Sequence, residues 1–226
     1  PGVTNSVTAI KNAQMAQSPM ILLGGAAATI LKGRGALQDI EQIDLYQSIT
    51  KWATTIEQDC DIIPMLEEAF DVAVSGIPGP VFVECPIDLL YDEEIVRKWY
   101  GQKSGKPKSL LDKVVKWYLR RHVDKLFACS PKSIEISKQE DITPFHVDES
   151  DIEVFLSQLN NAKSPAMVIG NQAMFRVENV MMLQKAVETL NIPVFLTGMA
   201  RGLMGEDHPI YFRHGRSTAL RNADLI

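Results

Sequence analysis

Short apolar runs alternate with amphipathic segments along the first ninety residues. Apolar or β-branched runs typical of buried strands occupy residues 20–23, 51–56 and 81–85. Between them, apolar side chains recur at the spacing of a helix face over residues 4–16, 44–48 and 62–75. Strands that alternate with helices in this way predict a parallel sheet with both faces covered.

The same alternation returns in the last third of the chain. Helical periods at residues 151–159 and 177–190 alternate with apolar runs at 166–170 and 193–197, and residues 222–226 resemble the start of another strand. The expected fold class is α/β, with two Rossmann-like parallel-sheet units joined by a partly helical linker. The expected domains are residues 1–90, a linker at 91–149, and a second domain at 150–226 that the chain end truncates.

The linker contains one basic amphipathic helix, predicted at residues 110–127. Its apolar side chains can share one face, while lysine and arginine occupy the rest. Such a helix can lie on a membrane surface or bind a partner. The simpler interpretation is a solvated helix that packs on its own domain.

Composition narrows the class of protein. The 226 residues carry a net charge of −5, which argues against a nucleic-acid binder. Cys60, Cys85 and Cys129 are far apart and form no metal-spaced pair, so we expect reduced, structural thiols. No apolar run reaches membrane-spanning length, and no secretory leader is recognisable. Because the chain ends in a strand-like segment, we expect a piece of a longer protein.

Two regions of small residues follow predicted strands and are candidate ligand sites. Residues 24–39 place glycine and alanine at a strand end and then present Leu37 and Gln38. The carboxyl ends of parallel strands are where α/β proteins bind ligands, although a tight strand-to-helix connection would look similar. In the second half, residues 170–172 and 197–198 would lie together if their strands are neighbours, around a nucleotide or as plain packing.

Three motifs stand out in the first half: Pro-Gly-Val-Thr-Asn at residues 1–5, the glycine-rich loop that ends in Leu37-Gln38, and Gly-Pro-Val-Phe-Val-Glu-Cys-Pro-Ile-Asp at 79–88. Together they resemble the thiamine-diphosphate enzymes of the acetolactate synthase family. The resemblance covers the whole chain. It implies the last part of a pyrimidine-binding domain, followed by most of a central Rossmann-like domain.

The resemblance also implies roles for individual residues. Pro1, Gly2 and Asn5 would line the pocket of the cofactor's aminopyrimidine ring, and Gln38 would face the thiazolium carbon where the substrate adduct forms. Leu37 and Lys51 would lie on the substrate channel. The residues implied in a central-domain nucleotide site are Gly170, Thr197, Gly198, Arg201, Gly202, His214 and Gly215.

The implied cofactors are thiamine diphosphate and Mg²⁺, with FAD or ADP as an optional occupant of the central domain. No metal ligand is expected in this chain. The glutamate that activates the pyrimidine would precede Pro1, and the Gly-Asp-Gly motif that binds the metal would follow Ile226. Thiamine diphosphate supplies its own carbon chemistry, so the protein must supply a close-fitting loop and a neutral hydrogen-bonding group such as Gln38.

Three functions remain open. Within the family the chain is most similar to lyases that cleave 2-hydroxyacyl-CoA to an aldehyde and formyl-CoA, and the alternative enzyme is acetolactate synthase. A cofactor-free remnant or interaction module is the third possibility. The resemblance implies a small-molecule substrate, a homodimer or homotetramer, and the cytosolic face of the endoplasmic reticulum, with cytoplasm or mitochondrion as alternatives. Membrane contact would come from segments outside this chain or from the 110–127 helix.

Overall fold

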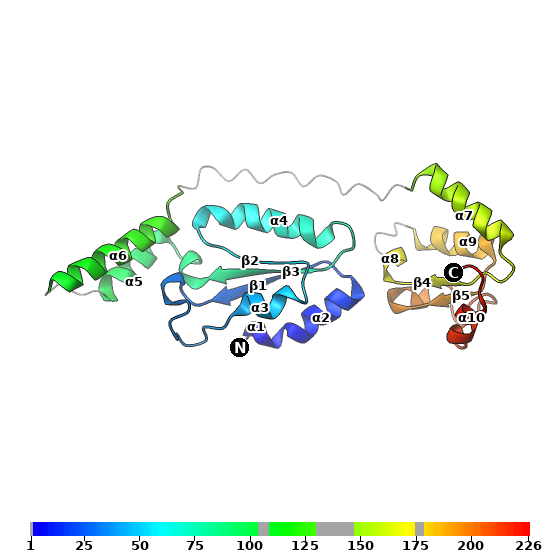
Figure 1. The fold of residues 1–226 in the computed structure, drawn as a ribbon, viewed down its shortest axis with the longest axis horizontal. Coiled ribbons are helices and arrows are strands. Elements are labelled where there is room, and N and C mark those ends of the chain that lie inside the picture. Colours follow the sequence, from blue (N-terminus) through cyan, green and yellow to red (C-terminus); the bar gives the residue numbers. More distant parts are fainter. Residues whose placement is uncertain (1, 104–108, 130–146, 175–178) are drawn as a thin grey trace. The chain divides into compact units, whose positions relative to one another are not determined.

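The computed structural model describes residues 2–103, 109–129, 147–174 and 179–226 (Figure 1). They fold into two compact units, residues 1–136 and 137–226, each with its own parallel sheet. The predicted α/β class with two parallel-sheet units is therefore confirmed.

The sheet of the first unit has its last strand in the middle. The strands β1 (Met20–Ala26), β2 (Trp52–Thr55) and β3 (Pro80–Pro86) are parallel and lie in the order β1-β3-β2. Because β3 is covered on both sides, Val81, Phe82 and Val83 are fully buried. This explains why β3 reads as a continuous apolar run and not as an alternating one.

Helices cover both faces of this sheet (Figure 1). Val81 and Val83 pack against α4, whereas Phe82 points to the other face and packs with Ile10 of α2 and Tyr46 of α3. The helices of the first unit are α1 (Gly2–Asn5), α2 (Val7–Ala16), α3 (Gln42–Gln47), α4 (Ile62–Val74), α5 (Glu93–Lys103) and α6 (Leu110–Leu126), of which α5 and α6 lie beyond the strand ends. Short 3₁₀ segments are η1 (Thr29–Leu31), η2 (Asp59–Asp61) and η3 (Ile87–Leu89).

The first predicted strand is longer than its apolar run. β1 continues through Gly24 and Gly25 to Ala26, because the ladder with β3 extends to the pair Ala26 and Pro86. A Cβ atom at Gly24 would lie 2.5 Å from the Phe82 ring. The glycine at this position is therefore required by packing inside the sheet. A Cβ at Gly25, in contrast, would meet no atom within 4 Å.

The predicted basic helix is confirmed as α6, which packs beside α5. Ser109 caps its first turn and accepts a hydrogen bond from the Asp112 N–H. Arg97 of α5 forms an ion pair of 2.7 Å with Asp124 of α6, and Val123 and Leu126 are buried. Leu110 and Leu111 at the other end of α6 are 80% and 74% exposed. Among the described residues, no helix combines the length and apolar character that crossing a bilayer requires.

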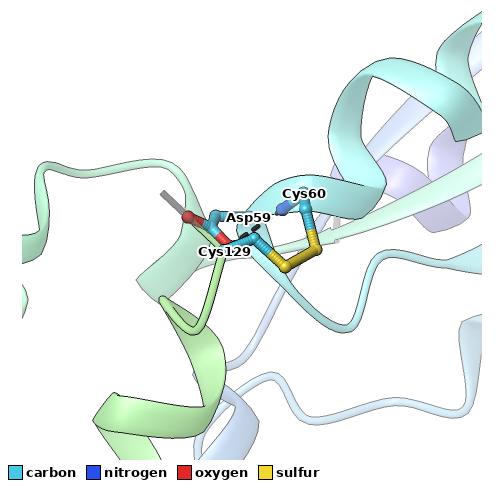
Figure 2. Close-up of side chains that lie close together, drawn as sticks. All are labelled: Asp59, Cys60 and Cys129. Atoms are coloured by element: carbon cyan, nitrogen blue, oxygen red, sulfur yellow. Dashed lines mark hydrogen bonds between the residues drawn. A yellow bond between two sulfur atoms is a disulfide. The ribbon is translucent and has the colours of Figure 1, made fainter. Parts of the chain in front are cut away.

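The expectation of three reduced cysteines is wrong for one pair. Cys60 of η2 and Cys129, which follows α6, form a disulfide with a Cα–Cα distance of 5.6 Å (Figure 2). Only Cys85 is a free thiol. The two bonded cysteines are 69 residues apart, so their pairing depends on how α6 returns to the sheet.

The second unit repeats the α/β pattern on a smaller scale. The parallel strands β4 (Met167–Ile169) and β5 (Val194–Leu196) form its sheet. Val187 of α9 packs on Ile169, Val194 and Leu196. The remaining elements are α7 (Glu149–Asn161), α8 (Asn171–Met174), α9 (Val180–Leu190), η4 (Gly198–Gly202) and α10 (Arg216–Asn222). Residues 177–178 of the predicted second helix lie outside the described residues.

The strand expected at the end of the chain is reduced to one bridge. Helix α10 extends to Asn222, and Leu225 then forms an isolated parallel bridge with Pro165. The carbonyl of Leu225 accepts a hydrogen bond of 2.9 Å from Ala166 N–H. The predicted strand at residues 222–226 is therefore present only as this bridge, and its first residue is the last residue of α10.

Candidate functional site

The loop that carries Leu37 and Gln38 leaves the carboxyl end of β1. Gly33 and Gly35 adopt left-handed backbone conformations, with φ angles of 71° and 70°. The carboxylate of Asp39 accepts a hydrogen bond of 2.6 Å from the Gly33 N–H and closes the loop. The Leu37 side chain is 91% exposed, and Gln38 is exposed with a left-handed φ of 64°. The loop thus presents one apolar and one amide side chain outward.

Two buried polar residues anchor this loop to the sheet. Lys32 Nζ lies 2.5 Å from Glu84 Oε2, and Thr55 Oγ1 donates to the same oxygen at 2.8 Å. Glu84 is completely buried, and its Oε1 has no hydrogen-bond partner among the described residues. Gln42 Nε2 donates to the carbonyl of Gly25 at 3.0 Å. These residues were not among the predicted site residues, although a glutamate inside an apolar strand is a recognisable signal.

The N-terminal residues implied for the pyrimidine pocket lie in or before α1. Gly2 and Asn5 are exposed on this short helix, and Pro1 lies outside the described residues. The carbonyl of Val3 accepts a hydrogen bond from the Tyr46 hydroxyl, which ties α1 to α3. No hydrogen bond that the structure gives for these residues joins them to Gln38, and their roles stay predictions.

Lys51 lies at the other edge of the sheet. It precedes β2, and its ammonium group donates to the carbonyls of Val72 and Ser75 at 2.5 and 2.6 Å. These carbonyls belong to the end of α4, so Lys51 caps that helix. Gln38 follows the carboxyl end of β1, and the first unit therefore does not bring the two residues together.

A polar cluster that sequence analysis did not identify joins four separate segments. Asp88 of η3 is 1% exposed and accepts hydrogen bonds from the Thr29 hydroxyl at 2.6 Å and from the Tyr100 hydroxyl at 2.9 Å. His122 Nε2 lies 2.7 Å from Thr29 Oγ1. Since the single hydroxyl proton of Thr29 is donated to Asp88, His122 Nε2 must donate to Thr29.

This cluster does not form a hydrolytic triad. In such a triad the imidazole stands between hydroxyl and carboxylate and removes the hydroxyl proton. Here the hydroxyl of Thr29 stands between His122 and Asp88, and its proton already has an acceptor. Burial lowers the pKa of His122, which favours the neutral ring. The cluster holds α5 and α6 against the strand ends.

The first unit also contains one group of potential metal ligands. Asp59, Cys60 and Cys129 place their ligand atoms within 4.8 Å of one another (Figure 2). Metals bind cysteine as the thiolate, and both sulfurs are consumed by the disulfide. The group is therefore a covalent link in this structure. Burial, and then the charge of Glu84, raise the pKa of the free Cys85 thiol, which disfavours a nucleophilic thiolate there.

In the second unit the two predicted loops meet, because β4 and β5 are neighbours. Thr197 N–H donates to the carbonyl of Ile169 at 2.8 Å, and Asn171 Oδ1 accepts from the Met199 N–H at 2.8 Å. A Cβ at Gly198 would lie 1.9 Å from Asn171 Oδ1, and the left-handed φ of 53° at this position also favours glycine. The predicted proximity of residues 170–172 and 197–198 is confirmed. The contacts themselves are plain packing at a strand edge, which leaves the nucleotide role untested.

The other residues implied for the nucleotide site are exposed. Arg201 and Gly202 lie in η4, and Gly215 adopts a φ of 77° immediately before α10, preceded by His214. The segment before His214 runs beside β5, where Phe212 N–H donates to the Val194 carbonyl at 2.9 Å. The roles of these residues in a nucleotide site stay predictions.

Both units match domains of one enzyme family. Residues 1–45 match the thiamine pyrophosphate enzyme N-terminal TPP binding domain, and residues 152–226 match the thiamine pyrophosphate enzyme central domain. Thiamine pyrophosphate is the same compound as thiamine diphosphate. The two matched segments lie in different units of the structure.

Individual relatives agree with this assignment. The whole chain is 43% identical to 2-hydroxyacyl-CoA lyase 2 of Danio rerio, and it covers 36% of that protein. It is 44% identical to 2-hydroxyacyl-CoA lyase 2 of Homo sapiens, and it covers 35% of that protein. A probable acetolactate synthase large subunit of Methanococcus aeolicus is 30% identical over 93% of the chain, and the alignment covers 30% of that protein. The chain thus spans about a third of the length of the curated relatives that it matches. On the two domain matches and these relatives, the chain belongs to the thiamine pyrophosphate enzymes.

Proposed function

We propose that this chain forms part of a thiamine-diphosphate-dependent carbon–carbon lyase that cleaves a 2-hydroxyacyl-CoA. The observation that carries the proposal is the identity of 43–45% over the whole chain to proteins named 2-hydroxyacyl-CoA lyase 2. Identity to proteins named probable acetolactate synthase is 28–30%. In the proposed reaction the C1–C2 bond of the substrate breaks, and the products are an aldehyde and formyl-CoA.

The residues at the carboxyl edge of the first sheet fit one side of a thiamine-diphosphate site. Gly25 leaves open space at the strand end, and Gln38 offers an exposed neutral amide. The buried Oε1 atoms of Gln42 and Glu84 lack a hydrogen-bond partner among the described residues, which marks this edge as a place where further polar contacts can form.

When bound, thiamine diphosphate supplies the carbon nucleophile and the electron sink for carbon–carbon cleavage. The residues of this chain would help to bind the substrate and would place a polar group beside the reacting atoms. Gln38 would donate a hydrogen bond to the substrate oxygen as it gains negative charge, and Leu37 would exclude water beside it. The closed turn between Gly33 and Asp39 would hold both side chains in place.

The test is Gln38→Ala in the full-length protein, assayed for formyl-CoA and aldehyde release. Loss of one hydrogen-bond donor to a developing oxyanion costs about 3 kcal/mol, so we expect kcat to fall roughly 100-fold. The affinity for thiamine diphosphate should change little. Unchanged turnover, or a loss confined to cofactor binding, would show that Gln38 has a structural role.

Gln17→Ala is a matched control, because Gln17 is another glutamine with a left-handed backbone, with a φ of 55°. It follows α2 and precedes β1, at the edge of the sheet away from the loop. It should retain the wild-type kcat. Gln38→Asn keeps the side-chain amide, and asparagine tolerates a left-handed backbone. This variant should therefore retain more activity than Gln38→Ala.

Acetolactate synthase is the second candidate, favoured by the 30% identity to the Methanococcus aeolicus protein. It would decarboxylate pyruvate and condense the product with a second keto acid. Supplying the full-length protein with pyruvate alone distinguishes the two enzymes. Formation of acetolactate, with no cleavage of 2-hydroxyacyl-CoA, would replace the lyase assignment. Failure of both reactions would favour the third alternative, a cofactor-free remnant or interaction module.

We also propose the metal ion, the central-domain nucleotide, the oligomeric state and the location that the resemblance implies. Mg²⁺ would be bound by residues outside this chain, and FAD or ADP would be held for structure in the second unit. A visible absorption spectrum of the full-length protein tests for flavin. Sedimentation tests the proposed homodimer or homotetramer, and cell fractionation tests the proposed location on the cytosolic face of the endoplasmic reticulum.

A further inference from the structure

The first unit contains an apolar cavity of about 370 Å³ beside the loop that carries Gln38. It lies where β1 and β3 end, because Ala28 follows β1, and Ile87 and Asp88 follow β3. Helices α5 and α6 form the opposite wall. Its lining residues are Ala28, Ile30, Leu31, Arg34, Ile87, Asp88, Trp99, Tyr100, Val115, Tyr118 and Leu119. The volume is typical of small-molecule sites.

The wall of this cavity leaves apolar side chains in contact with solvent. Leu31, Trp99, Ile87, Tyr118 and Val115 line it and are between 38% and 47% exposed. A group of exposed apolar side chains around a hollow is characteristic of a ligand or partner site, because a ligand that removes them from water gains free energy.

The fully buried polar side chain in the wall, Asp88, is already engaged. Both oxygens of Asp88 accept hydrogen bonds from the Thr29 N–H, and Oδ2 also accepts from the hydroxyls of Thr29 and Tyr100. Asp88 therefore has little hydrogen-bonding capacity left for a ligand, and most of the other lining residues are apolar. An aliphatic chain would bind without leaving a buried polar group unpaired.

One cation stands at the rim of the cavity. Arg34 is exposed, and none of the ion pairs within the described part of the chain includes it. A guanidinium binds phosphate and carboxylate groups well. An apolar cavity with a cationic rim matches a ligand that has an aliphatic chain and an anionic head.

The cavity and the proposed reaction site share one loop. Ile30, Leu31 and Arg34 line the cavity, and Leu37 and Gln38 follow in the same segment, between β1 and α3. We propose that the cavity binds the aliphatic tail of the 2-hydroxyacyl-CoA substrate, and that it makes the enzyme selective for longer acyl chains. This inference rests on the proposed lyase function.

The variant Val115→Phe tests the cavity, because Val115 lines it from α6 and the larger ring would occupy part of its volume. Val114→Phe is the matched control. Val114 is the preceding valine on the same helix, is similarly exposed at 55%, and does not line the cavity. Circular dichroism of both full-length variants checks that they remain folded.

The first measurement is binding of straight-chain saturated acyl-CoA of increasing length to the full-length protein. These probes lack the 2-hydroxyl group and are not substrates of the proposed reaction. Each methylene that enters the cavity should improve the affinity about 4-fold until the cavity is full. Val115→Phe should lower the affinity for long chains about 10-fold or more, whereas Val114→Phe should match the wild type.

The second measurement is kcat/KM for 2-hydroxyacyl-CoA of short and long chain length. Val115→Phe should lose activity on long chains and keep activity on the shortest. If lyase activity is present but neither affinity nor kcat/KM depends on chain length, the tail does not bind here and the inference is wrong. The inference is equally wrong if Val115→Phe changes only the oligomeric state, because the cavity wall would then be a subunit contact. If chain-length-dependent binding appears without lyase activity on any chain length, the proposed lyase function is wrong, whereas the binding of aliphatic chains in the cavity stands.

Discussion

Glu84 is a buried carboxylate whose charge is balanced mainly by Lys32. The Glu84 side chain is 0% exposed, and that of Lys32 is 32% exposed at a distance of 2.5 Å. The pair joins the loop after β1 to the central strand. Its two residues are far apart in the sequence, so its formation depends on β1 and β3 lying side by side.

Lys32→Met should destabilise the protein, because it leaves the Glu84 carboxylate buried without a cation. Breaking such a pair costs about 3 kcal/mol or somewhat more in free energy of unfolding, measurable by urea denaturation. The double variant Lys32→Met/Glu84→Gln should recover most of this loss, since it removes the buried charge as well. Lys113→Met, on the exposed face of α6, is the control and should change stability little. Equal stabilities of Lys32→Met and Lys113→Met would refute the role of the ion pair.

His122 should make stability depend on pH. Burial is the largest cause of its lowered pKa, with Lys125 and Arg34 acting in the same direction and Asp88 in the opposite one. In the unfolded chain the ring has its ordinary pKa of about 6.5. As the pH falls below that value, the unfolded chain takes up a proton that the folded protein takes up only at lower pH. The free energy of unfolding should therefore fall, by at most about 1.4 kcal/mol per pH unit for one proton.

The variant His122→Gln should lose this part of the pH dependence. Its side-chain amide can still donate to Thr29, but it does not titrate. Plots of the free energy of unfolding against pH should be parallel for wild type and variant above pH 6.5 and should differ in slope below it. Parallel curves over the whole acid range would mean that His122 is not the titrating group.

At the scale of elements, the disulfide links the short η2 segment to the end of α6. Its 69-residue loop encloses α4, β3, α5 and α6. A crosslink of this kind restricts the unfolded chain, and its removal typically costs 2–4 kcal/mol. We expect Cys129→Ser to lower the unfolding midpoint, and reductant to lower the wild-type midpoint by a similar amount.

Cys85→Ser is the control for the disulfide, because Cys85 is a free thiol. Its response to reductant should equal that of the wild type. Cys60→Ser/Cys129→Ser should show no response. A wild-type midpoint that is insensitive to reductant would show that the crosslink contributes nothing to stability.

The glycines of residues 24–35 in the first unit serve two different purposes. Gly24 is needed because Phe82 and Gln42 occupy the space where its side chain would be. The left-handed turn of Gly33 and Gly35 shapes the loop that presents Gln38. A glycine-rich stretch can therefore combine packing and loop geometry, and its sequence does not separate the two.

At the scale of the whole molecule, the chain covers about a third of its lyase-named relatives. In the proposed site this chain would supply only part of the contacts to the cofactor, because the implied activating glutamate and metal motif would lie outside residues 1–226. We expect calorimetry of the 226-residue chain with thiamine diphosphate and Mg²⁺ to detect no tight binding. The full-length protein, measured under the same conditions, is the positive control. Micromolar binding by the 226-residue chain alone would show that the cofactor site is complete within it.

The sequence by itself determined the elements and their class. Alternation of apolar runs and helical periods predicted the α/β units, the helix α6, and the neighbouring loops at residues 170–172 and 197–198. These features depend on side chains close in sequence, because a strand or helix is specified by the periodicity of its own residues. The motifs at residues 1–5, 37–38 and 79–88 also identified the enzyme family.

Only the tertiary structure decided the contacts between distant segments. The strand order β1-β3-β2 places the last strand in the centre, and this order brings Lys32 to Glu84. The return of α5 and α6 to the strand ends brings His122 to Thr29 and Cys129 to Cys60. Each of these pairs spans more than fifty residues, so no local pattern specifies it. The cavity beside Gln38 arises in the same way, from walls that meet only after the strands have ordered and the helices have packed.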